Sequence, residues 1–251
     1  MKISQSHPRF ESLRTRELLV QAVINGIVAP QGLLAHGRGE AFDYLIGEKT
    51  LPSARKAAKV AAASLLLADH PVISVNGNAA ALVPNELAHL ASTIPADIEV
   101  NLFHRSLERE KKIASVLKRL GIKNVLGVGA EASTRILGIS SPRRNVDPDG
   151  QGRSDVVLVP LEDGDRTLAL RKNGQTVIAI DLNPLSRTAQ QASITIVDNI
   201  TRALPILVTE SRRLKRQNRE SLRRLVRDFD NRKNLESTIR EIIAYLGKWD
   251  R

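Results

Sequence analysis

From residue 72 onward, short apolar runs rich in β-branched residues alternate with segments of helical periodicity. Two of these runs, DVVLVP at 155–160 and TVIAID at 176–181, are apolar along nearly their whole length. Runs of this kind are typical of strands buried on both faces of a parallel sheet. The sequence therefore predicts an α/β fold in which helices cover a mostly parallel sheet. The predicted strands are Val72–Asn76, Asp97–Leu102, Asn124–Val128, Asp155–Pro160, Thr176–Asp181 and Ile194–Asp198.

Helices are predicted between and before these strands. The segment 106–120 places four apolar residues on one face and stops at Gly121, a residue suited to the end of a helix. Residues 9–25 have an amphipathic pattern, with Pro8 in or near the first turn. Residues 53–68 have an Ala-rich pattern, and we expect its small side chains to allow close packing against a neighbour.

The chain length and the tail suggest how the domains are organised. With 251 residues and no long linker, the chain is expected to form one large domain with appendages. Asn199 is placed to cap a helix over 200–208, and the following residues predict two basic helices with a break around Asp230–Lys233. We therefore expect one α/β domain at 1–208, N-terminal helices included, and a helical extension at 209–251. We expect this extension to pack on the domain or on a dimer interface.

The composition excludes several classes of protein. Cysteine is absent, which excludes disulfides, thiolate metal sites, iron–sulfur clusters and a cysteine nucleophile. No apolar run approaches the roughly 18 to 20 residues that span a bilayer. The segment MKISQSHPRF lacks the apolar core of a secretory signal. We therefore expect a cytoplasmic protein without a membrane partner.

The net charge of +11 favours anionic partners such as phosphorylated metabolites, nucleotides or nucleic acid. Residues 209–251 contain 13 basic and 7 acidic residues, so more than half of the excess lies in the tail. Only 3% of the residues are aromatic, which leaves few platforms for stacking single-stranded nucleic acid. The composition therefore favours a small-molecule anion.

Polar residues collect at the carboxyl ends of five predicted strands. Ligands of open α/β sheets bind at this edge. For any one of these loops, turn formation is the favoured explanation, because Asn, Asp, Gly and Pro are turn formers. Since five loops deliver Asn or Asp to the same edge, we predict a ligand site there. The residues are Asn76 to Asn78 after the first strand, Asn101 in the second, 162–166 after the fourth, 181–184 after the fifth, and Asp198 and Asn199 after the last.

Two nucleotide-binding motifs nearly match. Gly47–Thr50 is similar to the end of a phosphate-binding P-loop, but it lacks the glycine directly before Lys49 and the glycine further upstream. Gly127–Ala132 matches the G-x-G-x-x-A pattern of dinucleotide sites, follows a strand and opens a predicted helix. Its acidic partner would have to be Asp147 or Asp149, which lie in a Pro/Arg/Gly-rich stretch and not at the end of a second strand. The motif thus matches in its glycines but not in its acidic partner, and an NAD-dependent oxidoreductase is kept as an alternative.

Two segments have the composition of phosphate or nucleotide contacts. Glycines on both sides of Arg38 would let the backbone approach a ligand while the guanidinium faces a phosphate. His36 could carry a proton, although a histidine beside glycines also fits a structural role. In the loop 181–188, a carboxylate can accept ribose hydroxyls while Arg187 and Thr188 meet phosphate oxygens. A turn followed by a helix cap is the structural alternative for this loop.

Long blocks of the sequence carry a family pattern. They are HPRFESLRTRELL at 7–19, GLLAHGRGEAFDYLIGEKT at 32–50, PVISVNGNAAAL at 71–82, DVVLVPLEDGDRT at 155–167 and VIAIDLNPLSRTAQQASITIVDNITRA at 177–203. These blocks resemble the archaeal phosphopantothenate synthetase family, also called 4-phosphopantoate–beta-alanine ligases. The similarity around FDNRKNL in the tail is weaker, and residues 129–153 look variable within the family.

The resemblance implies a cytoplasmic, homodimeric enzyme of coenzyme A biosynthesis with a Rossmann-like sheet. Such an enzyme joins 4-phosphopantoate to β-alanine through an acyl-adenylate and cleaves ATP to AMP and pyrophosphate, and Mg²⁺ is expected with the ATP. Arg14 is close enough to Arg16 to be an alternative to it. The implied ATP contacts are Arg16, Arg38, Asp181, Leu182, Asn183, Arg187, Thr188, Asn199 and Ile200.

The residue chemistry agrees with this reaction. Asp163, Asp165 or His36 could accept a proton from the β-alanine amine, and Arg38 could neutralise charge that develops in the adenylation step. Asp163 or Asp165 could also ligate Mg²⁺, which prefers oxygen ligands, but a turn and a helix N-terminus explain these two acids equally well. The residues assigned to the other substrates are Asn76, Asn78, Asn101 and Lys49.

A basic nucleic-acid-binding protein is a second alternative, because the tail is rich in arginine. The apolar residues between these arginines favour instead a buried or dimer-facing helix with a solvated basic face. We therefore expect small-molecule substrates and no nucleic acid. The arginines are Arg212, Arg213, Arg216, Arg219, Arg223, Arg224 and Arg227, and the apolar residues are Leu214, Leu222, Leu225, Val226 and Phe229.

Overall fold

The computed structural model describes residues 4–7 and 9–248. In this part of the chain, six parallel strands form one sheet in the order β3-β2-β1-β6-β7-β8. The order reverses between β1 and β6, as in Rossmann folds. All six predicted strands are confirmed. Their bounds are β1 (Pro71–Val75), β2 (Asp97–Val100), β3 (Val125–Leu126), β6 (Val156–Pro160), β7 (Thr176–Ile180) and β8 (Ile194–Ile196).

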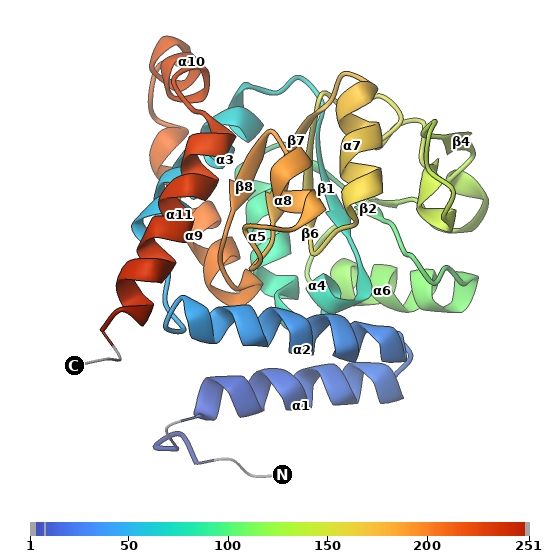
Figure 1. The fold of residues 1–251 in the computed structure, drawn as a ribbon. Coiled ribbons are helices and arrows are strands. Elements are labelled where there is room, and N and C mark those ends of the chain that lie inside the picture. Colours follow the sequence, from blue (N-terminus) through green and yellow to red (C-terminus); the bar gives the residue numbers. More distant parts are fainter. Residues whose placement is uncertain (1–3, 8, 249–251) are drawn as a thin grey trace.

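Helices cover both faces of the sheet (Figure 1). Leu158 in β6 belongs to the larger core, on the face that carries α3, α5, α6 and α9. Its neighbours Val157 and Val159 belong to the second core, on the face that carries α7, α8 and a hairpin of β4 and β5. Adjacent residues of one strand are thus buried on opposite faces, which explains the continuous apolar runs. The bounds are α3 (Pro52–Leu67), α5 (Pro84–Thr93), α6 (Leu107–Arg119), α7 (Gly164–Lys172), α8 (Arg187–Gln191), α9 (Ile200–Leu214), β4 (Thr134–Arg135) and β5 (Asn145–Val146).

The predicted helices at 9–25, 53–68 and 106–120 are confirmed as α1 (Phe10–Ile24), α3 and α6. Pro8 lies outside the described residues. The Ser106 side chain caps α6 by accepting from the Arg109 N–H, and Gly121 follows that helix with a φ of +90°. The small side chains of α3 pack against α9, α10 and α11, as expected for an Ala-rich helix.

The segment around Arg38 is helical, although the glycines on both sides of Arg38 did not suggest a helix in the sequence. It forms the middle of α2 (Pro30–Leu45), which crosses the carboxyl edge of the sheet with α1 on its outer side (Figure 1). Two of its glycines allow close approach. A Cβ at Gly39 would lie 3.3 Å from Leu182, and a Cβ at Gly32 would lie 2.4 Å from the Asn78 side chain.

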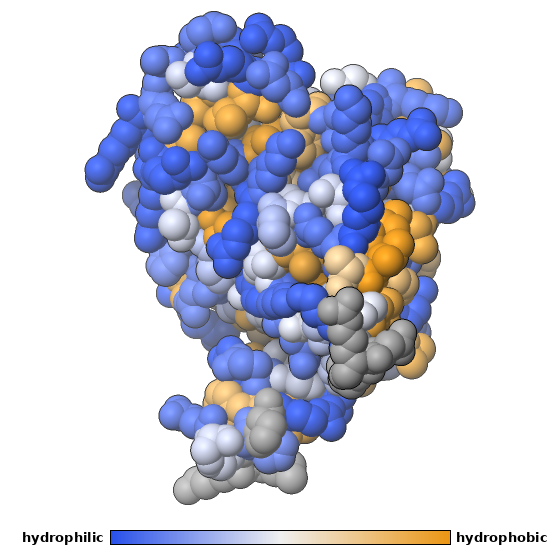
Figure 2. Space-filling model, turned by 60° about the vertical axis from the view of Figure 1, so that its left-hand side comes forward, coloured by the Kyte–Doolittle hydropathy of each residue, from blue (hydrophilic) through white to orange (hydrophobic). Residues whose placement is uncertain are grey.

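The tail contains the two predicted basic helices, but the first begins later than expected. α9 continues past residue 208 to Leu214, and α10 (Arg219–Arg227) and α11 (Asn231–Leu246) follow. The break near residue 230 is confirmed, since Asp230 caps α11, but the break before α10 was not predicted. Leu214 and Leu222 are buried in the main core, whereas the outer face of this region is mostly hydrophilic (Figure 2). The division at residues 208 and 209 stays a prediction.

The Gly127–Ala132 motif does not open an α-helix. Gly129–Glu131 form a single 3-10 turn, and a Cβ at Gly127 would lie 2.7 Å from the Val100 carbonyl oxygen. The Gly127 N–H donates to Asp147, at 3.3 Å. Protein groups thus occupy the place that a dinucleotide phosphate requires, which removes the structural support for the oxidoreductase alternative. No helix in the described residues is both long enough and apolar enough to cross a membrane.

Candidate active site

A cavity of about 1300 Å³ opens at the carboxyl edge of the sheet, where the strand order reverses between β1 and β6. Loops after β1, β2, β6 and β7 line it, together with one face of α2 and the segment 137–143. This is the place where open α/β sheets bind ligands. The prediction that polar loop residues meet at one edge is therefore confirmed for the loops after β1, β6 and β7.

One face of α2 forms a wall of the cavity. Gln31, Ala35, Arg38 and Phe42 line it, at spacings that repeat along one side of a helix. Arg38 is exposed toward the cavity near Asp181. Burial raises the pKa of the Asp181 carboxyl, and hydrogen bonds and the charge of Arg38 oppose this rise. The guanidinium that was predicted to contact a phosphate therefore lies at the cavity, and a helix carries it.

The loop after β7 contains both a turn and a cluster of polar groups. The Asp181 carboxylate accepts from the Asn183 N–H at 2.9 Å and from the Ser186 hydroxyl at 2.5 Å. Ser186 in turn caps α8. The Thr188 hydroxyl donates to the Glu162 carbonyl at 2.7 Å, which ties this loop to the loop after β6. The structural reading of the loop is therefore correct, and its nucleotide contacts stay a prediction.

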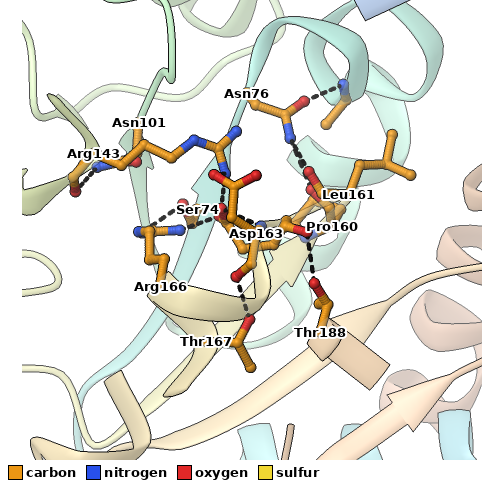
Figure 3. A network of polar contacts seen from close by, with 12 residues as sticks. Ser74, Asn76, Asn101, Arg143, Pro160, Leu161, Asp163, Arg166, Thr167 and Thr188 are labelled. Carbon is orange, nitrogen blue, oxygen red and sulfur yellow. Dashed lines mark hydrogen bonds and ion pairs between the residues drawn. The ribbon is translucent and has the colours of Figure 1, made fainter. Parts of the chain in front are cut away.

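The asparagines assigned to substrate hold backbone segments in place. Asn76 donates to the carbonyls of Pro160, at 2.8 Å, and Leu161, and accepts from the Ala79 N–H (Figure 3). It thereby joins the ends of β1 and β6 at the reversal point. Asn78 donates to the Gly32 carbonyl and holds α2, and both asparagines line the cavity.

Asn101 is buried and is not among the residues that line the cavity. Its amide donates to the carbonyls of Arg143, at 3.1 Å, and Asn145, at 3.3 Å. It therefore positions the segment that carries Arg143. Its assignment as a direct substrate contact has no support from this geometry.

A buried ion-pair network forms part of the cavity lining. The Glu162 carboxylate forms ion pairs with both Arg143 and Arg166, whose side chains are 7% and 1% exposed. Arg166 also contacts Gln151 and donates to the Ser74 hydroxyl at 3.3 Å. Burial lowers the pKa of both guanidinium groups to about 10. One carboxylate thus sits between two buried cations.

The two acids after β6 have different surroundings. Asp163 lies 3.6 Å from Arg143 (Figure 3), and its Oδ2 atom is buried without a hydrogen-bond partner among the described residues. Asp165 forms an exposed ion pair with Arg187 at 2.7 Å. Within the described residues, no group of three or more His, Asp or Glu side chains is arranged to hold a metal ion. Asp163 is therefore the better candidate for a ligand to a metal that a nucleotide brings with it.

Some predicted site residues lie away from the cavity lining. Arg16 forms an ion pair with Glu40 at 2.7 Å, and the Lys49 ammonium lies 5.3 Å from the Tyr245 ring centroid. Burial lowers the pKa of the half-buried His36 imidazole. Asn199 caps α9 and donates to Asp43, and Ile200 is buried in the core. The cavity lining includes none of these five residues.

Known proteins align with this sequence over nearly its whole length. The family model described as phosphopantothenate/pantothenate synthetase matches residues 53–245. The chain belongs to this family. A protein of Thermococcus kodakarensis named 4-phosphopantoate–beta-alanine ligase is 48% identical over 258 residues, covering 100% of this chain and 98% of that protein. The protein of the same name from Methanosarcina mazei is 50% identical and covers 97% of this chain and 95% of its own length.

A third ligase of that name, from Methanospirillum hungatei, is 54% identical over 202 residues, covering 80% of this chain and 82% of that protein. The part of the chain that the family model matches contains the loops after β1, β6 and β7. The helix α2, which supplies Arg38, precedes the matched part. The resemblance in the sequence is therefore confirmed at the level of the family.

We expect Arg38→Lys to weaken ATP binding by about tenfold. Lysine keeps the charge but loses the planar fork that meets two phosphate oxygens at once, a difference of roughly one charge-assisted hydrogen bond. Titration calorimetry with ATP measures the effect, with Arg55→Lys on α3, outside the cavity lining, as the control. An unchanged affinity would show that Arg38 faces solvent only.

Proposed function

We propose that this protein is an AMP-forming ligase that condenses 4-phosphopantoate with β-alanine at the expense of ATP, in coenzyme A biosynthesis. The observation that carries the proposal is the near-complete alignment with ligases of that name at about half identity. The cavity at the strand-order reversal gives the reaction a place that suits a nucleotide. We further place the reaction in the cytoplasm.

ATP is assigned to the β7 side of the cavity. There, Arg38 and Arg187 supply positive charge, and Asp181 supplies an acceptor for ribose hydroxyls. The acid substrate then occupies the side near the β1–β6 reversal, so that its carboxylate reaches the α-phosphate. Formation of an acyl-adenylate brings two anions together, and the cationic lining lowers the free energy of that approach.

We assign to Asp163 the role of accepting the proton from the β-alanine amine. Asp163 lines the cavity with a side chain that is 46% exposed, whereas His36 does not line it and Asp165 is paired with Arg187. Mg²⁺ is expected to arrive on the ATP phosphates and to neutralise their charge, and Asp163 is the residue that would contact it directly or through water. Asp163 can contact Mg²⁺ in the first step and accept the proton in the second, because the amine reacts only after adenylation.

A homodimer is part of the proposal. Apolar side chains are exposed on the outer pair of helices, where Ile24 of α1 is 71% exposed and Leu34 of α2 is 74% exposed. Exposed apolar groups of this kind are more frequent at interfaces than on isolated surfaces. Pairing through α1 and α2 would cover them.

We expect the purified protein to convert ATP, 4-phosphopantoate and β-alanine into AMP, pyrophosphate and phosphopantothenate. Non-phosphorylated pantoate should be a poor substrate, because cationic groups placed for its phosphate would stay unpaired. Phosphorus NMR of the products with each acid checks both statements. Formation of ADP would contradict the adenylate route, and the absence of turnover with either acid would contradict the proposed function.

A further inference from the structure

The helix α2 carries Arg38 at the cavity, but little of the helix itself is buried. Of the residues 30–45, all within the described part of the chain, only Asp43 is buried, with 5% of its surface exposed. Phe42 packs against the main core with only part of its side chain. Because a buried carboxylate is stable only where hydrogen bonds and opposite charge compensate it, the partners of Asp43 have a large part in fixing α2.

Arg202 of α9 is the charged partner of Asp43. Its Nη2 atom donates to Oδ1 of the carboxylate at 2.5 Å, and its Nη1 atom donates to Oδ2 at 3.2 Å. Two hydrogen bonds from a planar guanidinium fix the direction of approach as well as the distance. Asn199 donates to the same carboxylate at 2.9 Å. These contacts hold α2 in one orientation against the start of α9.

A second carboxylate anchors Arg202 at the edge of the sheet. The Nε atom of Arg202 donates to Asp198 at 2.9 Å. Asp198 lies two residues after β8, is 1% exposed, and accepts from the Thr50 hydroxyl at 2.5 Å. Arg202 therefore connects α2 to the sheet through two ion pairs, and its own position is fixed from the side of the sheet.

Asp43 and Arg38 lie on different sides of α2. Five residues span about 7.5 Å along a helix and turn roughly 140° around it, so one side of α2 meets α9 while another lines the cavity. A Cβ at Gly39 would lie 3.3 Å from Leu182, so α2 also packs closely on the loop after β7, to which ATP is assigned. A rotation or shift of the helix at Asp43 therefore moves the Arg38 guanidinium within the cavity without changing its chemistry.

We propose that Arg202 is a positioning residue for ATP, and that through Asp43 it fixes α2 so that Arg38 meets the phosphate groups. This inference rests on the proposed function and adds a residue that acts on the ATP site from outside it. Neither Arg202 nor Asp43 is among the residues that line the cavity, so we expect their effect on ATP binding to pass through α2.

The test is a double-variant cycle between Arg202 and Arg38. Arg202→Lys keeps a positive charge between Asp43 and Asp198 but loses the two-point contact, so we expect the variant to fold while α2 is held less firmly. Titration calorimetry should show an ATP affinity lower by about 3- to 10-fold, the loss expected for one hydrogen bond. In the Arg38→Met background there is no guanidinium to place, so adding Arg202→Lys should change the ATP affinity by less than about twofold.

Arg212→Lys is the matched control, because Arg212 is an exposed arginine in the last turn of the same helix. Its ATP affinity should equal that of the unmodified protein. If Arg202→Lys does not fold, Asp43→Asn replaces it in the same cycle, since that variant leaves the ion pair between Arg202 and Asp198 in place.

Two results would overturn the inference. A lower melting temperature of Arg202→Lys with unchanged ATP affinity would show that Arg202 serves the fold alone. Losses of affinity that multiply in the double variant would show that Arg202 acts on ATP independently of Arg38. The absence of ATP binding by the unmodified protein would instead contradict the proposed function, a result distinct from both.

Discussion

Glu162→Gln is expected to lower the free energy of unfolding by about 3–5 kcal/mol, the cost of leaving a buried charge without its partner. The substitution keeps the size of the side chain but removes the negative charge that forms ion pairs with both Arg143 and Arg166. Both guanidinium groups are almost fully buried, so water has little access to replace the carboxylate. Urea denaturation at pH 7 measures the change.

Glu11→Gln is the matched control for this measurement. Glu11 pairs with Arg14 on the surface of α1, where the two side chains are 72% and 52% exposed, so its loss should cost less than about 1 kcal/mol. The double variant Arg143→Met with Glu162→Gln should recover part of the stability, because it leaves one unpaired cation in place of two. Equal stability of Glu162→Gln and Glu11→Gln would mean that the buried network is solvated.

Asp181→Asn is expected to weaken ATP binding by about 10- to 150-fold, with little change in stability. The amide oxygen can still accept from the Asn183 N–H, and the amide nitrogen can donate to Ser186, so the turn after β7 is kept. A charged acceptor for ribose hydroxyls is lost. Burial already raises the pKa of this carboxyl, so removing its charge imposes no electrostatic cost on the fold.

Calorimetry and thermal unfolding of the same sample separate the two roles of Asp181. Asp228→Asn, at an exposed position after α10, controls for the loss of one negative charge. A clear fall in melting temperature together with unchanged ATP affinity would show that Asp181 serves the turn alone. The reverse pattern supports the assignment of ATP to the β7 side of the cavity.

The sheet could be predicted because its strands are buried on both faces. Val157, Leu158 and Val159 are all fully buried, and a run of this kind is visible without any knowledge of what packs against it. Once the strands are placed, the positions of Asn76 and Asp181 at the carboxyl edge follow from the parallel arrangement. The location of the site could therefore be predicted from the local sequence.

The helix α2 was missed because Gly37 and Gly39 lower helical propensity. Long-range contacts hold it, among them the ion pair of Asp43 with Arg202 at 2.5 Å. Arg143 was missed for a related reason: it lies in a stretch without periodicity, and the carboxylate that holds it comes from another loop. The position of Lys49 over Tyr245 depends on where α11 docks. Such pairings depend on tertiary packing, which the local pattern does not encode.

The ion pair between α2 and α9 also bears on how the protein is made. Asp43 and Arg202 are 159 residues apart, and Asn199 donates to the same carboxylate. A chain leaves the ribosome N-terminus first, so α2 is synthesised long before the residues that anchor it. Until about residue 202 has emerged, Asp43 of α2 cannot form its ion pair with Arg202. We expect the nascent chain to complete its sheet strand by strand and to close the cavity only at the end of synthesis, because contacts so distant in sequence form late.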